Sequence, residues 1–445
     1  MTRVVIEMAQ GRRGWPAAFV FAIYLAGSLL LPIAAFRDWG AQPDAMVLVP
    51  GIALPSGLWL NRMTLLAPII LVLAIGTALR DGQWPTLHWL DGMVVLWVLT
   101  PILVGIANDS PFSSDLLQSV YLGLTWGAPY AAGRLVCRKP GDLRACLYVI
   151  IGFGIVTLGM AFVEFAFGRF WYAAVYGFHP YQLEGAQRYF GYRPLLLFED
   201  PNQIAMWWAT VALASLTLLF SDAHTSFMKW MLVLLALPSF LFQAIGAGLL
   251  TLFGVVLIRI PRRRIIIAIM AAILVIVTCL LVFRGPILRS GRQFTESSAA
   301  GHAVKQFLRN SSIGSFGWRL GLEEENEALL RERIWFGWGD VNYWHRDDAS
   351  QRPWGLATLV TGAYGVIGFS IWIGMTLVPC GLVFARGANV PSVDSLPLRG
   401  FAVIILVNTI DASMNSAYLL PTFFFVGLVG CGKDGRRELL GSGEE

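Results

Sequence analysis

Long apolar runs separated by short polar segments repeat along most of the chain. Many of the runs approach the roughly 20 residues that a helix needs to cross a bilayer, and they contain few charged residues. The runs lie at 17–36, 63–79, 91–107, 116–133, 145–167, 203–220, 230–244, 246–258, 265–283, 354–384, 399–412 and 416–431. The pattern predicts an all-α polytopic integral membrane protein with about twelve transmembrane helices.

Basic clusters between the runs predict the orientation of these helices. Arg12 and Arg13, the segments 133–144 and 259–264, and the basic residues within 433–437 are each separated from the next cluster by four runs. Because Lys and Arg collect in cytoplasmic loops, an even number of crossings puts all four clusters in the cytoplasm. Both termini are therefore expected to be cytoplasmic.

The same topology leaves two polar segments on the external face. The chain divides into spans with an external loop at 168–202 (residues 1–283), a large external loop with short helices (284–353), and C-terminal spans with a cytoplasmic tail (354–445). The stretch 46–60 contains the helix breakers of "PGIALPSG", so we expect it to lie outside without crossing.

Composition supports the membrane class and excludes others. Of 445 residues, 56% are hydrophobic and 14% charged, and the mean hydropathy is +0.63, whereas about a quarter of a soluble protein is charged. The net charge of +5 follows from cytoplasmic loops and requires no nucleic acid. Five scattered cysteines without a CxxC pair suggest neither a disulfide framework nor a zinc site. No nucleotide-binding or metalloprotease motif is present, so neither cofactor nor metal is expected.

Charged residues gather where the first external loop meets the run at 203–220. The stretch "YFGYRPLLLFEDPNQIAMWW" contains Arg193, Glu199, Asp200 and Asn202. Asp200 can cap a helix whose first residue is Pro201, and the free N–H groups of such a helix start attract an anion such as phosphate. A plain cap within an aromatic interfacial belt is the alternative interpretation.

The second external loop predicts a helix over 318–335, ended by the Gly337 and Gly339 pair. On that helix Arg319, Glu323 and Asn326 share one face, and Glu327 and Arg331 are spaced for an ion pair. A solvated helix with surface ion pairs is the alternative.

Further candidates flank this helix. Arg284 and Arg289 follow a span end, where they suit a lipid diphosphate or act as ordinary interface anchors. His345, in "YWHRDD", is the candidate general base, with Asp347 and Asp348 near enough in sequence to orient it, although a lone loop histidine is more often inert.

Three motifs resemble those of the O-antigen ligase/O-antigen polymerase family. "FEDPNQIAMWWATVALASL" resembles its F-x-N-P-N-x-x-A segment, "WRLGLEEENEALLRERIWFGWGD" its R…W…P-x-x-G-x-G element, and "LATLVTGAYGVIGF" its L-x-x-L-x-E-x-G-x-x-G segment. The three occur in the family's order, and twelve spans with both termini inside also fit.

The resemblance implies a metal-independent, inverting glycosyltransferase. Its substrates would be an undecaprenyl-diphosphate-linked glycan and an acceptor glycan or lipid, joined by polymerisation or ligation at the outer face of the bacterial inner membrane. Family members hold the diphosphate through external arginines; the motif carries this role to Arg319, and Arg193 is assigned by position alone.

The sequence departs from the family at two positions. The family histidine falls on Trp354 and the family glutamate on Ala363. The candidate catalytic residues are therefore His345, Asp340 and Asp200, with the glutamates at 323–325 as further options. The candidate substrate-binding residues are Arg193, Arg319, Arg284, Arg289, Glu199, Asn202 and Glu323.

Two other functions remain open. A transporter of polysaccharide or lipid-linked glycan would carry ionisable residues within its spans, where Glu164 and Asp411 are among the few candidates, and paired repeats, which the sequence lacks. A non-catalytic subunit, working with other polysaccharide export proteins, would explain Trp354.

The topology gives a first testable prediction. A reporter that is active only outside the cytoplasm should be active when fused near residues 55 and 310, and silent near 140 and 262. Activity at 262 would reverse the predicted orientation.

Overall fold

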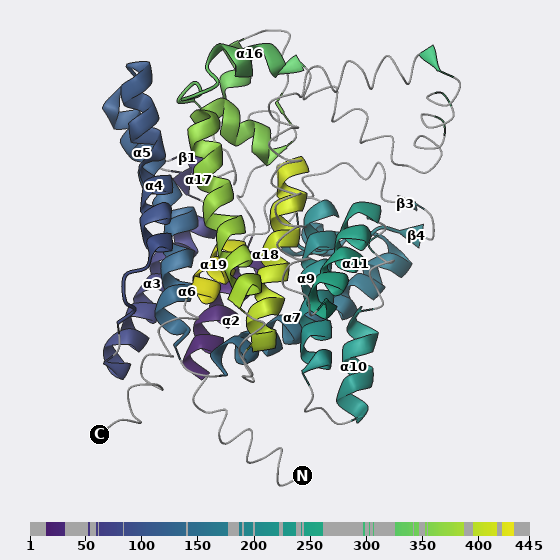
Figure 1. Cartoon of the computed structure of the whole chain (residues 1–445). Coiled ribbons are helices and arrows are strands. Elements are labelled where there is room, and N and C mark those ends of the chain that lie inside the picture. Colours follow the sequence, from purple (N-terminus) through teal and green to yellow (C-terminus); the bar gives the residue numbers. More distant parts are fainter. Residues whose placement is uncertain are drawn as a thin grey trace.

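The computed structural model is a bundle of helices with two very short strand pairs (Figure 1). It describes residues 15–31, 52–53, 59–60, 62–82, 84–138, 141–176, 187–188, 191–198, 201–221, 226–236, 242, 244–260, 297–298, 302, 306, 325–340, 342–346, 352–353, 355–386, 395–415 and 421–430. The first helices are α2 (Trp15–Leu30), α3 (Arg62–Asp81), α4 (Trp89–Asn108), α5 (Phe112–Leu122), the π-helix η3 (Gly123–Gly127), α6 (Ala128–Val136), α7 (Asp142–Phe167) and α8 (Trp171–Tyr176). They are followed by α9 (Pro201–Phe220), α10 (Ser226–Ala236), α11 (Ile245–Arg259), α16 (Glu327–Glu332), the 3₁₀ helix η5 (Tyr343–Arg346), α17 (Leu356–Arg386), α18 (Ser395–Met414) and α19 (Thr422–Gly430).

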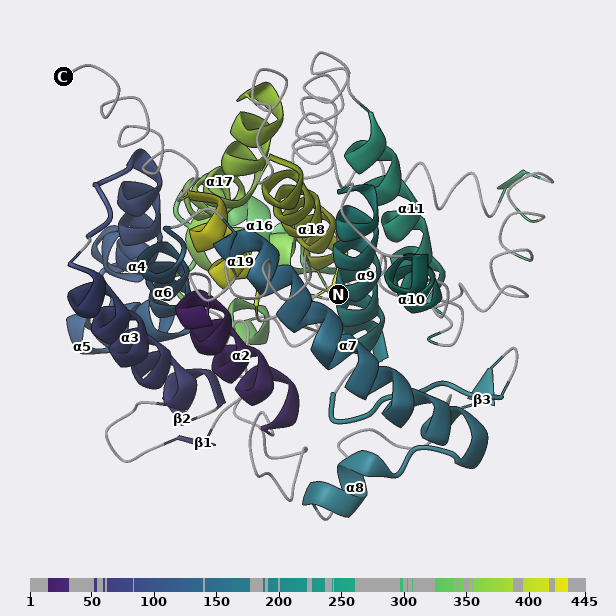
Figure 2. The same cartoon turned by 90° about the horizontal axis from the view of Figure 1, so that it is seen from below.

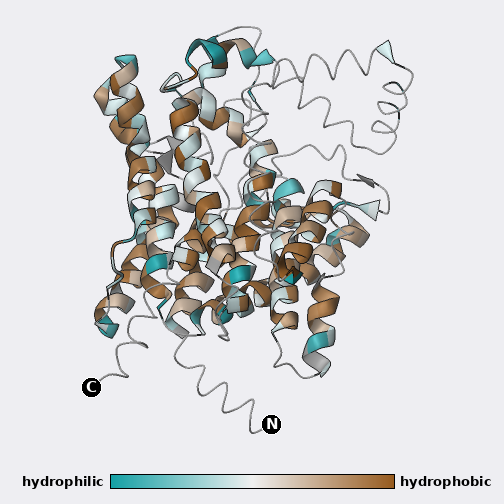
Figure 3. Ribbon diagram, in the orientation of Figure 1, coloured by the Kyte–Doolittle hydropathy of each residue, from teal (hydrophilic) through white to brown (hydrophobic). Residues whose placement is uncertain are grey.

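The predicted all-α membrane class is confirmed. Among the described residues, α4, α7, α9, α17 and α18 are five helices long and apolar enough to cross a membrane. Apolar residues run along the helices, whereas α16 is hydrophilic (Figure 3). Each predicted run overlaps a helix in its described part, whereas 265–283 and parts of the runs at 17–36, 230–244 and 416–431 lie outside the described residues. The number of twelve spans stays a prediction, because α10 and α19 are short.

The helices α17, α18 and α19 form the middle of the bundle (Figure 2). On one side α19 packs against α6, which contacts α3; on the other side α18 packs against α9 and α11. α7 connects the two sides through its contacts with α2 and α9.

Glycines allow the closest of these contacts, between α6 and α19. A Cβ on Gly133 would lie 2.4 Å from the carbonyl oxygen of Phe424, and one on Gly427 would lie 2.3 Å from that of Tyr130. Small residues at such crossings let helix backbones approach closely, which is how helices associate where no hydrophobic force favours their contact.

A buried arginine joins three chain segments at one end of the bundle. Arg134 donates to the carbonyl oxygens of Thr86 (2.8 Å) and Gly430 (2.9 Å) and pairs with Asp91 at 3.3 Å. Tyr130 also donates to Asp91, at 2.5 Å. This polar cluster of Arg134, Asp91 and Tyr130 fixes the first turn of α4, the end of α6 and the end of α19.

The opposite end of α4 contacts the large loop. Asn108, the last residue of α4, hydrogen-bonds Gly337 and Arg333. Twenty helical residues span about 30 Å, close to the hydrocarbon thickness of a bilayer. The polar cluster around Arg134 and the contact with the large loop therefore lie at opposite ends of a membrane-length helix.

Glu164 anchors the polar segment that follows α7. Its carboxylate is fully buried. One oxygen accepts the backbone N–H groups of Phe170 and Trp171 (both 3.1 Å), and the other accepts those of Leu195 and Leu196 (2.7 and 2.8 Å). All four donors are backbone amides, so this acidic group holds the loop against the end of α7.

Three local expectations can be compared with the structure. The helix expected over 318–335 ends at Glu332, because residues 334–335 hydrogen-bond α17 instead; the part before 325 lies outside the described residues. The expected pair of Glu327 and Arg331 is confirmed at 2.5 Å. In the stretch 46–60, β1 (Ile52–Ala53) pairs antiparallel with β2 (Trp59–Leu60).

Removal of the Glu164 carboxylate should destabilise the protein. Glu164→Ala would leave four amides without their acceptor, and each buried unpaired amide costs about 1–3 kcal/mol. We expect a clearly lower thermal unfolding midpoint in detergent, with Glu332→Ala, at an exposed position, as the control. Equal midpoints for the two variants would contradict this role.

Candidate functional site at the break in α17

α17 is broken at Gly365, where φ is 67° and ψ is −170°. Only glycine adopts such a backbone conformation without strain. An unbroken helix would join the N–H of Val366 to the carbonyl of Gly362, and that of Ile367 to the carbonyl of Ala363. The break opens both bonds and leaves four backbone groups in need of partners.

The large loop supplies all four partners. Trp338 and Gly339 donate their N–H groups to the carbonyls of Gly362 and Ala363, each at 2.9 Å. Val366 donates to the carbonyl of Ile334 at 2.8 Å, and Ile367 to that of Trp335 at 3.4 Å. The loop segment 334–339 thus takes the place of a helical turn.

Two glycines make this contact possible. A Cβ on Gly337, which has a φ of 67°, would lie 2.5 Å from the nitrogen of Gly365. A Cβ on Gly365 would lie 2.1 Å from the carbonyl oxygen of Trp335. The glycine-rich motifs at 337–339 and 362–365, far apart in sequence, meet here.

Asn108, at the end of α4, also hydrogen-bonds this loop segment. Its amide nitrogen donates to the carbonyls of Val104 (3.0 Å) and Gly337 (3.1 Å), while its oxygen accepts a bond from Arg333. One side chain at the end of α4 therefore fixes both the glycine turn and an arginine.

Two arginines flank one indole ring on this loop. Trp338 donates from its ring nitrogen to the carbonyl of Leu329 at 2.9 Å. The guanidinium carbons of Arg333 and Arg346 lie 5.0 and 4.8 Å from the centroid of the Trp338 ring. Both arginines are exposed, and within the described part of the chain no carboxylate pairs with either. The pair forms a positively charged surface beside the break.

Carboxylates and a tyrosine lie next to this surface. Asp340 is half-buried, and one of its oxygens accepts the N–H of Asn342 at 2.9 Å. The Tyr364 hydroxyl donates to the side-chain oxygen of Gln118 in α5 at 3.4 Å, and the same helix carries the buried Asp115. Asp115 in turn accepts a bond from Ser110 at 2.6 Å.

His345 lies in η5 on the same loop. Its side chain is exposed, and its ring meets Trp344 edge-on at 5.6 Å. The neighbouring Tyr343 is buried and donates to the carbonyl of Thr358 at 3.3 Å, which holds η5 against α17. Asp347 and Asp348, expected to orient His345, lie outside the described residues.

Arg193 occupies a different place. Only 4% of the residue is exposed. Its guanidinium donates to the carbonyls of Phe242 (2.9 Å) and Pro201 (3.0 Å) and to the side-chain oxygen of Asn202 (3.3 Å). Asn202 lies in the first turn of α9, which begins at Pro201 as expected. Arg193 thus joins its own segment to the start of α9 and to Phe242.

The structure divides the described candidates into two groups. Asp340 and His345 lie on the loop beside the break, whereas Arg193 and Asn202 lie near the pair of β3 (Gln187–Arg188) and β4 (Gly191–Tyr192). The β3–β4 pair and α16 stand well apart (Figures 1 and 2). The other candidates lie outside the described residues: Glu199, Asp200, Arg284, Arg289, Arg319 and Glu323, as does Trp354.

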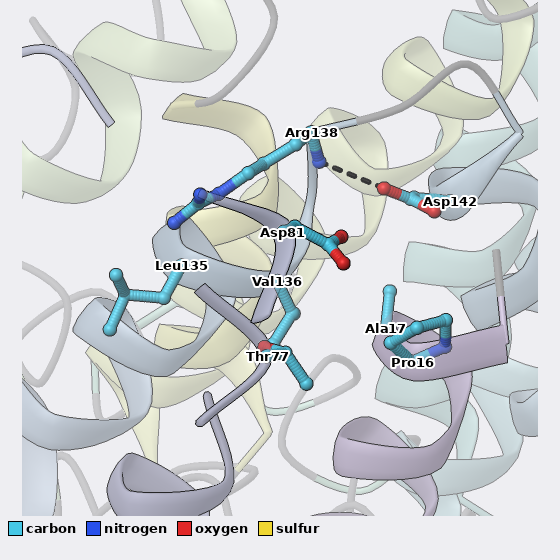
Figure 4. A pocket seen from close by; sticks show the side chains of 8 residues that line it. All are labelled: Pro16, Ala17, Thr77, Asp81, Leu135, Val136, Arg138 and Asp142. Atoms are coloured by element: carbon cyan, nitrogen blue, oxygen red, sulfur yellow. Dashed lines mark hydrogen bonds between the residues drawn. The ribbon is translucent and has the colours of Figure 1, made fainter. Parts of the chain in front are cut away.

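A small pocket lies away from this site, beside Arg138 and Asp142 (Figure 4). It is formed by α2, α3 and the connection from α6 to α7, and the backbone N–H of Arg138 donates to Asp142 at 2.8 Å. Elsewhere in the described ranges, no three His, Cys, Asp or Glu side chains gather to ligate a metal ion.

Sequence reasoning missed Asn108, Asp115, Arg333, Arg346 and Tyr364. The spacing of the glycines at 337, 339, 362 and 365 was the available signal, since paired glycines suggest a close backbone approach. The partners themselves come from α4, α5 and α17, which no local pattern connects.

Comparison of the chain with models of known protein families gives no match, and comparison with curated proteins gives none either.

A methyl group at Gly337 should release the loop from α17. Gly337→Ala forces a Cβ to within 2.5 Å of the Gly365 nitrogen, and the released hydrogen bonds contribute about 0.5–1.5 kcal/mol each. Hydrogen exchange at the amides of Trp338, Gly339 and Val366 should accelerate by about tenfold or more, because 1.4 kcal/mol corresponds to a factor of ten. Gly82→Ala is the matched control, because Gly82 has a similar φ of 64° and a Cβ there meets nothing within 4 Å. Unchanged exchange in Gly337→Ala would show that the contact is not formed.

Proposed function

We propose that the protein is a membrane glycosyltransferase that polymerises or ligates an undecaprenyl-diphosphate-linked glycan on the external face of the bacterial inner membrane. In this proposal both termini are cytoplasmic, and the reaction inverts the anomeric centre and uses no metal. The observation that carries the proposal is the docking of the 334–339 turn onto the break at Gly365. That contact joins two of the three motifs on which the family resemblance rests.

The arginine pair is suited to the leaving group. Arg333 and Arg346 present their guanidinium groups beside the Trp338 ring, and guanidinium groups bind phosphate oxygens through charge-assisted hydrogen bonds. Neutralising a diphosphate as it departs stabilises the transition state. Arg319 remains the arginine that the family motif itself indicates.

Asp340 is the best placed base among the described candidates. It is half-buried, close to Arg333 in sequence, and lies beside the break that organises the loop. A carboxylate in this position can accept the proton of the acceptor hydroxyl as the hydroxyl oxygen attacks the anomeric carbon. His345, exposed on η5, is the second candidate, and Asp200 the third.

Two observations favour an enzyme over a transporter. Glu164 is bonded to four backbone amides, and Asp411 accepts a bond from Asn415 at 2.8 Å. Both contacts are structural ones, whereas transport sites use intramembrane ionisable groups for ions or substrates. A non-catalytic subunit of a polysaccharide secretion complex is the remaining alternative.

The deciding experiment compares the lipid-linked glycans of cells with and without the protein. Accumulation of single repeat units on undecaprenyl diphosphate would indicate a polymerase, and accumulation of full-length unattached chains a ligase. Accumulation on the cytoplasmic face would contradict the proposal and indicate a flippase.

Variants in the same cells test the residues. Arg333→Ala, Arg346→Ala and Asp340→Asn should each reduce product at least about tenfold, since charge-assisted bonds contribute about 1.5–3 kcal/mol. Arg331→Ala is the control, because this exposed arginine pairs with Glu327 and such pairs contribute about 0.3–0.5 kcal/mol. Protein levels in the membrane are measured in parallel. Full activity in all three variants, and in His345→Ala, would favour a non-catalytic role.

A further inference from the structure

The exposed face of α17 leads to the large loop. Beyond the break, exposed side chains recur at Ile367, Ser370 and Val378, which lie on one face of the helix. On a helix apolar enough to cross a membrane, an exposed stripe of this kind contacts lipid. Since Ile367 donates its N–H to the carbonyl of Trp335, the loop backbone lies directly on the upper end of this stripe.

The neighbouring helix α4 indicates the depth, along the bundle, at which the loop contacts α17. A Cβ on Gly368 would lie 3.5 Å from Thr100, and a Cβ on Gly339 would lie 3.5 Å from Asn108 and 3.6 Å from Val104. At the same level Ile106 of α4 is still 72% exposed. The glycine turn therefore lies beside a part of α4 whose surface is still apolar, not beyond its end.

The loop exposes two aromatic side chains at this level. Trp335 is 65% exposed and Phe336 46% exposed. The carbonyls of Ile334 and Trp335 and the N–H of Gly337 are all hydrogen-bonded within the protein. Irregular backbone is tolerated at membrane depth only when its polar groups are satisfied in this way. Aromatic residues beside arginines are typical of the boundary between lipid and water.

We propose that Trp335 and Phe336 insert into the bilayer boundary at the α16 end, so that segment 333–339 is a re-entrant turn seated in the lipid surface. We assign lipid as the occupant of this face because Trp335 and Phe336 are exposed, and because the carbonyl of Trp335 accepts the N–H of Ile367, the residue at which the lipid-facing stripe of α17 begins. The inference concerns how the loop sits in the membrane, and it does not depend on the proposed enzymatic activity.

Site-directed spin labelling of the full-length protein in nanodiscs tests the proposal. In a background with the five native cysteines replaced, single cysteines are introduced as Trp335→Cys, Phe336→Cys and Glu332→Cys, with Ile106→Cys as the lipid-facing reference. Collision rates are measured with oxygen, which concentrates in lipid, and with a water-soluble nickel chelate. The oxygen-to-nickel ratio should be several-fold higher at positions 335 and 336 than at 332, and close to that at 106.

Two outcomes would overturn the proposal. Ratios at 335 and 336 equal to that at 332 would place the turn in water. Low collision rates with both reagents would show that protein covers this face. The two aromatic positions are independent readouts, so failure of one variant to fold leaves the other decisive.

Discussion

A helix that breaks in apolar surroundings must find new partners for its backbone, and this constraint organises the end of the bundle at which α16 lies. At Gly365 two helical hydrogen bonds are lost, and four bonds to segment 334–339 replace them. An unpaired amide or carbonyl away from water costs several kcal/mol, so the loop cannot leave without destabilising α17. Trp338 belongs to this docked segment, and Arg333 and Asp340 directly flank it. Arg346 lies on η5, which Tyr343 holds against α17.

Three buried charged groups elsewhere bond mainly to the backbone. Glu164 accepts four amides, Arg193 donates to two carbonyls, and Arg134 donates to two more besides pairing with Asp91. Each of these groups joins segments that are distant in sequence. A charged side chain that is bonded to the backbone in this way has a structural role. Residues that bind a substrate are therefore better sought among exposed side chains such as Arg333 and Arg346.

The break, the arginine pair and the exposed aromatics lie together at one end of α4. A substrate carrying its reactive group on a membrane lipid would present a diphosphate at the same depth. The proposed reaction and the proposed seating of the turn in lipid are therefore compatible in space, although they rest on different observations. One rests on the chemistry of the loop, and the other on the exposed aromatic residues next to the lipid-facing stripe of α17.

The sequence alone determined the class of the protein and the position of most helices, because a membrane-length apolar run has few alternatives to helix. It also predicted the start of α9 at Pro201 and the pairing of Glu327 with Arg331, since both depend on neighbours within a few residues. It did not reveal the break in α17, the end of α16 at Glu332 or the backbone partners of Arg193. Those depend on which segments meet in space: Gly337 with Gly365, Asn108 with Arg333, and Phe242 with Arg193. Hydropathy and spacing report on single elements, and only tertiary packing decided which polar groups were paired and which were left facing outward.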